Sequence, residues 1–130
     1  MPTVLLVEDE SPILEHLRYA LERAGYTVLS ADSGESALRI CRHHTTAIDV
    51  LVSDVLMQPV SGFEVAAQVK AANPGAIVIL MSASPRWTFT DPLNPDALLD
   101  KPFTHDDLLT AIARATTIPA HPGGPRESWN

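Results

Sequence analysis

Short apolar runs alternate with amphipathic segments along most of this chain. The runs Thr3–Val7, Ile48–Ser53 and Ala76–Met81 are almost continuously apolar, which is typical of strands covered on both faces of a sheet. Tyr26–Ala31 and Asp96–Leu99 read as two further strands. Because helical segments separate these runs, the strands are expected to be parallel and joined by crossover connections.

Helical periodicity and end signals mark four helices between and after the strands. Pro12 suits the first position of the first helix, and Gly25 suits its C-terminal stop. Five strands and these helices predict a doubly wound parallel α/β sheet of flavodoxin-like order 2-1-3-4-5. The expected N-caps are Ser11, Asp32, Ser61 and Thr104, and the expected helices span about Pro12–Ala24, Ser33–His44, Ser61–Asn73 and Thr104–Thr116.

The segment Ser84–Pro95 breaks this rhythm. Its three prolines, Pro85, Pro92 and Pro95, make a full helix improbable, so the helix expected before the fifth strand is predicted to be reduced or irregular. The last 13 residues, rich in proline and glycine, predict a flexible tail at 118–130 after one domain at 1–117.

Charge and composition restrict the environment and the partners. The net charge of -7 argues against direct nucleic-acid binding, which favours basic surfaces. No apolar run approaches the roughly 20 residues of a membrane span, and the start of the chain has no signal segment. The expectation is therefore a cytoplasmic protein with no membrane contact.

Polar side chains follow the predicted strands at the points where the strands end. Glu8 and Asp9 follow the first strand, and Asp54 follows the third. Ser82 follows the fourth strand and Lys101 the fifth. Because the carboxyl ends of parallel strands share one edge of a sheet, these groups are expected to converge there. Carboxylates, a hydroxyl and an ammonium in one place suit phosphoryl transfer with a divalent metal.

These motifs resemble the response-regulator receiver domain, the phospho-accepting module of two-component signalling. The resemblance covers about residues 3–117. It rests on their joint occurrence at consecutive strand ends, because each motif alone is common. The motifs are Leu6-Val7-Glu8-Asp9-Glu10, Ser53-Asp54-Val55-Leu56-Met57, Gly62, Met81-Ser82-Ala83 and Lys101-Pro102-Phe103.

The resemblance implies a role for each site residue. Asp54 would accept a phosphoryl group from a histidine kinase or a histidine phosphotransfer protein. Glu8, Asp9, Asp54 and the backbone carbonyl of Leu56 would hold Mg²⁺ or Mn²⁺. Ser82 would bond a phosphoryl oxygen, and Lys101 would pair with the carboxylate and then with the phosphate. Met57, Ser84 and Leu98 would border the site.

The sequence departs from the family pattern at several positions. The acidic pair is Glu8-Asp9 rather than two aspartates, and the proline after Asp54 is shifted by one position to Pro59. Leu98 stands three residues before Lys101, where the family commonly has Tyr or Phe. Leu98 cannot offer a ring, so the signal is not expected to leave by the usual face.

Two other kinds of function remain as alternatives. Leu98 and the reduced helix favour a phosphorylation-independent binding module that keeps the receiver fold. A phosphatase with an aspartyl nucleophile usually needs a second acid two residues on, where this chain has Leu56. The chain is therefore expected not to be an enzyme, beyond supporting phosphoryl transfer to its own Asp54. The downstream partner is expected to be a protein that the sequence does not identify.

Overall fold

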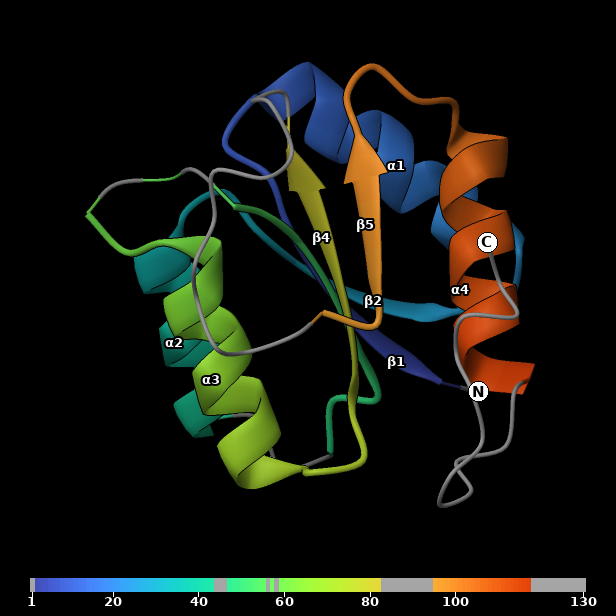
Figure 1. The fold of residues 1–130 in the computed structure, drawn as a ribbon. Helices are drawn as coiled ribbons and strands as arrows, with labels where there is room; N and C mark the ends of the chain where they lie inside the picture. Colours follow the sequence, from blue (N-terminus) through green and yellow to red (C-terminus); the bar gives the residue numbers. More distant parts are fainter. Residues whose placement is uncertain (1, 44–46, 56, 58, 83–94, 118–130) are drawn as a thin grey trace.

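The structure, a computed structural model, describes residues 2–43, 47–55, 57, 59–82 and 95–117. There, a parallel sheet lies between two pairs of helices (Figure 1), and its order β2-β1-β3-β4-β5 confirms the predicted one. The strands are β1 (Thr3–Val7), β2 (Thr27–Ala31), β3 (Val50–Asp54), β4 (Ile77–Ser82) and β5 (Ala97–Asp100). The helices are α1 (Ser11–Arg23), α2 (Gly34–His43), α3 (Gly62–Ala72) and α4 (His105–Thr117).

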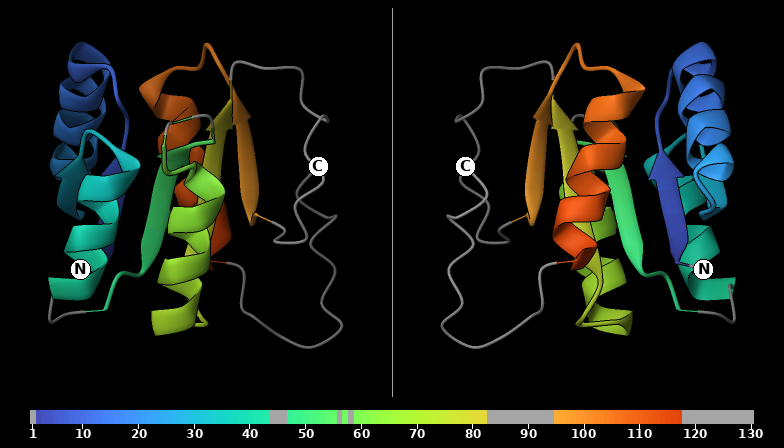
Figure 2. Two further views of the ribbon diagram at one scale, coloured as in Figure 1. Left: turned by 90° about the vertical axis from the view of Figure 1, so that its left-hand side faces the viewer. Right: turned by 90° about the vertical axis from the view of Figure 1, so that its right-hand side faces the viewer.

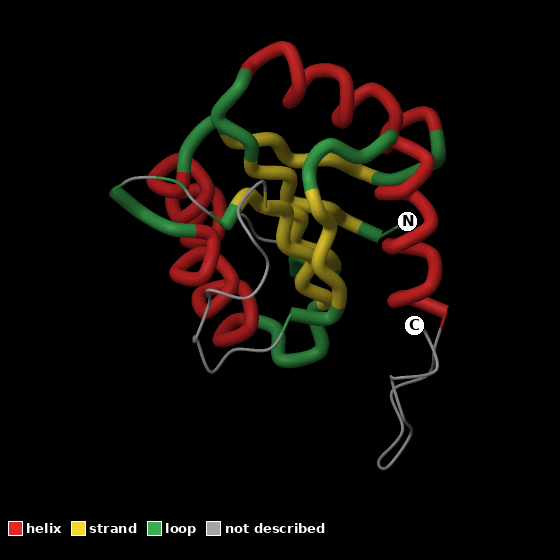
Figure 3. The backbone as a smooth tube through the Cα atoms, turned by 45° about the horizontal axis from the view of Figure 1, so that its top comes forward, coloured by secondary structure: helices red, strands yellow, loops and turns green. Residues whose placement is uncertain are grey.

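Each face of the sheet is covered by its own pair of helices. α2 and α3 lie on one face and α1 and α4 on the other, and Figure 2 shows each pair from its own side. Successive strand residues point to opposite faces, so Leu5 packs towards α2 and α3 while Leu6 packs towards α1 and α4. The continuous apolar runs of β1, β3 and β4 are therefore required by two cores, one on each face. Figure 3 shows the strands enclosed between the helices.

The helix ends follow the expected caps in part. Ser61 Oγ accepts a hydrogen bond from Glu64 N–H at 3.3 Å, and Thr104 Oγ1 accepts one from Asp107 N–H at 3.1 Å. These caps of α3 and α4 confirm the prediction. Gly25 also ends α1 as expected, with a φ of 102°, in the left-handed region that glycine adopts without a steric penalty.

Two expected caps are wrong. Ser11 is the first residue of α1, because the carbonyl of Glu10 accepts the first helical hydrogen bond, from Leu14 N–H at 2.9 Å. In α2 the capping oxygen is Ser33 Oγ, which accepts from Ser36 N–H at 3.0 Å. Asp32 Oδ1 accepts a bond from the Ser36 hydroxyl at 3.4 Å instead, because the helix begins only at Gly34.

Two aspartates bind backbone amides at the amino ends of the strands. Asp49 Oδ2 accepts a hydrogen bond from Thr3 N–H at 2.8 Å. Asp96 Oδ2 accepts one from Val78 N–H at 2.8 Å and lies 3.7 Å from Lys70 Nζ. Both carboxylates therefore satisfy backbone donors at the edge of the sheet opposite the carboxyl ends.

Several sequence predictions fall on residues that are not described. The tail predicted at 118–130 lies outside the described residues, and so does the segment predicted to be a reduced helix, Ser84–Pro95, up to residue 94. The peptide bond between Lys101 and Pro102 is cis, which the sequence alone does not reveal. None of the helices that the structure describes is both long and apolar enough to cross a bilayer.

Candidate functional site

The carboxyl ends of four strands bring the predicted site residues to one edge of the sheet. Glu8 directly follows β1, and Asp54 is the last residue of β3. These two strands are neighbours in the sheet, with Val7 opposite Ser53. Lys101 directly follows β5, and its N–H donates to the carbonyl of Ser82, at the end of β4, at 2.8 Å. Strand register therefore places side chains that are far apart in sequence beside one another.

Lys101 joins the two buried carboxylates. Its Nζ lies 2.6 Å from Asp54 Oδ1 and 3.0 Å from Glu8 Oε1. Glu8 is 0% exposed and Asp54 is 6% exposed, so these ion pairs are largely shielded from water. A buried carboxylate needs such a partner, because its ionised form is otherwise poorly solvated.

Glu8 points into the site rather than out to solvent. Its Oε2 accepts a hydrogen bond from Glu10 N–H at 3.0 Å, while its Oε1 pairs with Lys101. Both carboxylate oxygens are therefore engaged. The glutamate fits here because its extra methylene lets the carboxylate turn back beneath its own loop.

Burial and neighbouring charges separate the pKa values of the two carboxyl groups. Burial raises the pKa of Asp54 to about 7, and the negative charge of Glu8 adds to the rise while Lys101 opposes it. Burial also pushes up the pKa of Glu8, but hydrogen bonds from Glu10 N–H, Lys101 and Asp54 outweigh it, so its pKa lies below the ordinary value. Without a metal, Glu8 therefore ionises at a lower pH than Asp54.

The donor set fits a hard divalent cation. One oxygen from each of Glu8, Asp9 and Asp54 lies within 4.8 Å of the others. Ligand oxygens around Mg²⁺ stand about 3–4 Å apart, so small rotations bring these oxygens into range. When the three carboxylates are ionised, Lys101 neutralises only one of them, and two negative charges remain for a cation.

Gly62 allows α3 to approach the end of β3. A Cβ at this position would lie 2.1 Å from the carbonyl oxygen of Asp54, which is far inside van der Waals contact. Gly62 N–H also donates to the Val55 carbonyl at 3.0 Å. The glycine therefore lets the first turn of α3 lie directly against the backbone of the candidate acceptor.

The other predicted residues lie in different surroundings. Ser82 ends β4, next to the end of β3, and is 3% exposed. Met57 is 6% exposed and lies in the core beneath α2 and α3, and Leu98 of β5 packs partly buried against the same core. The Leu56 carbonyl and Ser84 lie outside the described residues.

Comparison with known proteins gives the family. The family model described as "Response regulator receiver domain" matches residues 4–113, and the chain belongs to this family. Its fold is generally that of a phospho-acceptor rather than an enzyme, and its members generally bind Mg²⁺.

Individual relatives agree with this assignment. The chain is 35% identical to Sensor kinase CckA of Brucella abortus over 85% of its own length and 12% of the relative. It is 31% identical to the alkaline phosphatase synthesis transcriptional regulatory protein PhoP of Bacillus subtilis over 90% of its length and 50% of the relative. The chain thus spans half or less of these longer proteins. Together they place it among the receiver domains of two-component signalling.

Solved structures show the same fold. A response regulator receiver protein from Sinorhizobium medicae is similar with a TM-score of 0.81 and 29% identity, over 90% of this chain and 95% of that one. The response regulator TrrA from Thermotoga maritima, in complex with Mg²⁺ and BeF, is similar with a TM-score of 0.73 and 29% identity, over 88% and 99% of the two chains. The second structure shows that a receiver of this fold takes a metal with a phosphoryl mimic.

Sequence analysis alone missed one contact within the site and one outside it. Strand-end position predicts that Glu8 is near the metal, but it does not predict its pairing with both Lys101 and Glu10 N–H. Likewise, nothing in the spacing of the histidines shows that His16 and His105 meet, with ring centroids 5.3 Å apart. The histidine contact depends on how α1 and α4 pack.

Proposed function

We propose that this chain is a phospho-accepting response regulator receiver whose acceptor is Asp54. The single observation that carries the proposal is the 2.6 Å ion pair between Lys101 Nζ and Asp54 Oδ1, beside the carboxylates of Glu8 and Asp9. The phosphoryl donor would be a histidine kinase or a histidine phosphotransfer protein. The output would pass to a protein partner without direct contact to nucleic acid.

The transfer exchanges one bond to phosphorus for another. An oxygen of the ionised Asp54 attacks the phosphorus of a phosphohistidine, forming an O–P bond as the N–P bond breaks. The electron pair of the N–P bond returns to the imidazole, which leaves with a proton from solvent. The product is an aspartyl phosphate, and the same carboxyl group is restored when water later removes the phosphate.

Residues of this chain supply part of the positive charge and the hydrogen-bond donors that the step needs. Lys101 favours the ionised form of Asp54 and has further N–H groups to offer to the incoming phosphoryl oxygens. The Ser82 hydroxyl, at the end of the neighbouring strand, would donate to another phosphoryl oxygen. Glu8 would hold Lys101 in position while charge moves from the carboxylate to the phosphate.

Glu8, Asp9 and Asp54, together with the Leu56 carbonyl, would hold the metal. When bound, Mg²⁺ supplies positive charge beside the phosphoryl oxygens. The surplus of negative charge and the close set of oxygens at this edge support this assignment.

Intact mass spectrometry after incubation with acetyl phosphate and Mg²⁺ tests the proposal. We expect the wild-type chain to gain the mass of one phosphoryl group and Asp54→Asn to gain none. Asp32→Asn, which removes an exposed carboxylate from the end of a neighbouring strand, should behave as the wild type. A gain that persists in Asp54→Asn would contradict the proposal.

A second candidate is a binding module that works without phosphorylation. The packing of Leu98 into the core supports it, because no ring is present there to rotate when the site changes. Under this alternative the wild-type chain would gain no phosphate, and the affinity for its partner would be equal with and without acetyl phosphate.

A further inference from the structure

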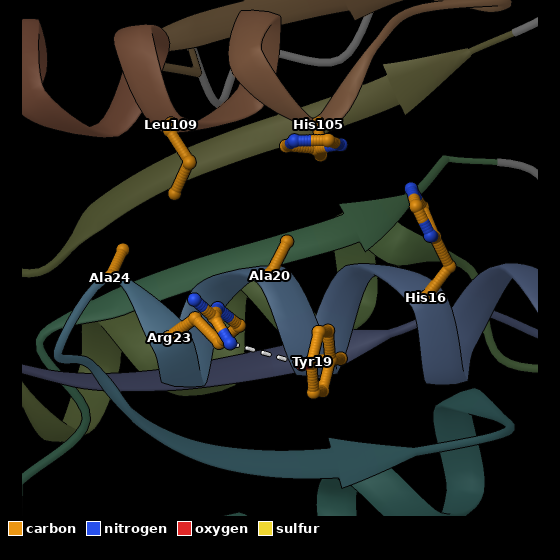
Figure 4. A pocket seen from close by; sticks show the side chains of 7 residues that line it. All are labelled: His16, Tyr19, Ala20, Arg23, Ala24, His105 and Leu109. Carbon is orange, nitrogen blue, oxygen red and sulfur yellow. Dashed lines mark hydrogen bonds between the residues drawn. The ribbon is translucent and has the colours of Figure 1, made fainter.

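Two exposed histidines meet at a groove between α1 and α4 (Figure 4). His16 lies in the second turn of α1, and His105 is the first residue of α4. Their rings stand edge to face with centroids 5.3 Å apart, and both line a hollow of about 450 Å³. His16 is exposed, and the side chain of His105 is 45% exposed. An ion from solution can therefore reach both rings.

The core beneath the two histidines fixes the backbones that carry them. Leu17, next to His16, is 3% exposed, and Leu108, one turn after His105, is 1% exposed. Both leucines belong to the core between the sheet and these two helices. Helix packing therefore sets the spacing of the histidines, while the exposed rings can still turn about their own side-chain bonds.

The spacing matches that of two imidazoles on one metal ion. An imidazole nitrogen lies about 2.0–2.1 Å from Zn²⁺, and the ligands of this ion are arranged as a tetrahedron. Two imidazole rings on one such ion have centres about 5 Å apart, close to the 5.3 Å between His16 and His105. Rotation of the rings, without movement of either helix, is therefore enough to point one nitrogen of each at a shared ion.

Acidic side chains lie beside the pair. Asp106 Oδ1 is 3.6 Å from His105 Nε2, and the Asp106 side chain is 84% exposed. Neighbouring ligand atoms on Zn²⁺ stand about 3.4 Å apart, so this carboxylate is well placed to be a further ligand. Asp107 adds a second acid to the same turn of α4. The surroundings on α4 therefore favour a cation.

Positive charge on α1 is neutralised or distant. Arg18 pairs with both Glu15 and Glu22. Arg23 stands two turns of helix from His16, about 10 Å, which is about the distance over which salt screens exposed charges. A cation at the histidine pair therefore meets little repulsion from this helix.

We infer that His16 and His105 bind a transition-metal ion of the class of Zn²⁺, with Asp106 as a third ligand. Imidazole suits Zn²⁺, Cu²⁺ and Ni²⁺, whereas Mg²⁺ takes hard oxygens such as those at the carboxyl ends of the strands. The two sites therefore select different metals. A metal at the histidine pair joins α1 to α4 and stabilises the folded chain. This inference does not depend on the phosphorylation proposed above.

Isothermal titration of the full chain with Zn²⁺, in excess Mg²⁺, tests the site. Two imidazoles are half the ligand set of a structural zinc site, so we expect a dissociation constant between about 1 and 200 µM. Asp9→Asn removes an acidic side chain at the strand ends and should leave this affinity unchanged. That control separates zinc at the histidine pair from zinc at the carboxylates.

Glutamine variants show whether one ion needs both rings. His16→Gln and His105→Gln should each weaken Zn²⁺ binding by at least about tenfold. The double variant should bind as weakly as either single one, because losing one ring already breaks the shared site. His43→Gln, at the end of α2 on the other face of the sheet, should bind as the wild type does. Asp106→Asn should weaken binding by a smaller factor, and no change would overturn the third ligand.

Two further measurements do not rely on heats of binding. In NMR spectra, Zn²⁺ should shift the ring signals of His16 and His105 together and leave those of His43 in place. Zn²⁺ should raise the melting temperature of the wild type but not of the double variant, and unfolding in chelator checks that the variants keep the fold. The inference is overturned if the wild type binds no Zn²⁺ at about 1 mM, if the single variants bind as the wild type does, or if their losses add in the double variant.

Discussion

At the residue scale, the role proposed for Asp54 sets two opposing requirements. A nucleophile for phosphorus must be ionised, yet this carboxyl group is buried and its pKa is raised to about 7. Lys101 at 2.6 Å compensates for only part of the cost of burial. The metal-free site is therefore under electrostatic strain that a cation would relieve.

The raised pKa makes the stability of the metal-free protein depend on pH. The folded pKa of Asp54 is about 7 and the ordinary value is 3.8, so between these values the folded state binds a proton that the unfolded chain has lost. The stability that the protonated Asp54 contributes to the folded state is therefore fully present below pH 3.8 and is lost as pH rises through 7.

In Asp54→Asn the side chain cannot ionise, so this variant should not lose stability as pH rises through 7. With a metal chelator present, we expect the free energy of unfolding of the variant to rise by about 2–4 kcal/mol relative to that of the wild type between pH 4 and pH 8. Urea unfolding at several pH values measures the difference. Asp32→Asn should show no such trend, and a difference independent of pH would contradict the prediction.

Removing the ammonium group should affect stability and metal binding in opposite directions. Lys101→Met keeps much of the stem but leaves Glu8 and Asp54 facing each other. We expect it to destabilise the metal-free protein by about 3 kcal/mol at pH 8 and by less at pH 5, while binding Mg²⁺ about tenfold more tightly. Unfolding curves and Mg²⁺ titrations measure the two effects.

Lys70→Met is the matched control for Lys101→Met. Lys70 forms a longer pair with Asp96, 3.7 Å, away from the site. Lys70→Met should lower the free energy of unfolding by about 1 kcal/mol or less and leave the affinity for Mg²⁺ unchanged. Equal effects of the two variants would mean that Lys101 has no special role in the balance of charge.

At the element scale, the position of α3 depends on a glycine. Gly62→Ala would place a methyl group 2.1 Å from the Asp54 carbonyl oxygen, so the helix or the end of β3 would have to move. We expect a loss of about 2–3 kcal/mol in the free energy of unfolding, together with slower phosphorylation by acetyl phosphate. Denaturant unfolding and timed mass spectrometry measure these effects.

Gly75→Ala serves as the control for Gly62→Ala. Among the described residues, the nearest atom to its Cβ would be Asn73 Oδ1, at 3.6 Å. It should therefore change the free energy of unfolding by less than about 1 kcal/mol. If both alanine variants behaved alike, close approach to Asp54 would not be the reason for glycine at position 62.

Local patterns in the sequence predict the elements and their order, but not all of their ends. Apolar periodicity predicts the strands and helices, and the rules for doubly wound sheets give the strand order. Ser61 and Thr104 act as caps because their hydroxyls accept from N–H groups of the first helical turn. Ser11 fails as a cap because α1 begins one residue earlier than expected, with the Glu10 carbonyl accepting the first helical hydrogen bond from Leu14 N–H. The groove between α1 and α4 is not predictable, because it depends on packing between segments far apart in sequence.

At the scale of the whole molecule, metal binding and folding are linked. A cation that binds only the folded state adds about 2.7 kcal/mol of stability at one hundred times its dissociation constant. We expect Mg²⁺ to raise the melting temperature of the wild type, but to have little effect on Asp9→Asn. Glu10→Gln, which changes the adjacent exposed acid, should respond as the wild type does.

The two edges of the sheet differ in how firmly they are held. At the amino edge, Asp49 and Asp96 accept hydrogen bonds from the backbones of β1 and β4, at the end of the strands opposite Asp54. If Asp54 is phosphorylated as proposed, we expect the backbone to move least at this amino edge and most at the carboxyl ends of the strands. Hydrogen exchange should show it directly: amides at Thr3 and Val78 keep their protection, while those around Val55 and Lys101 change.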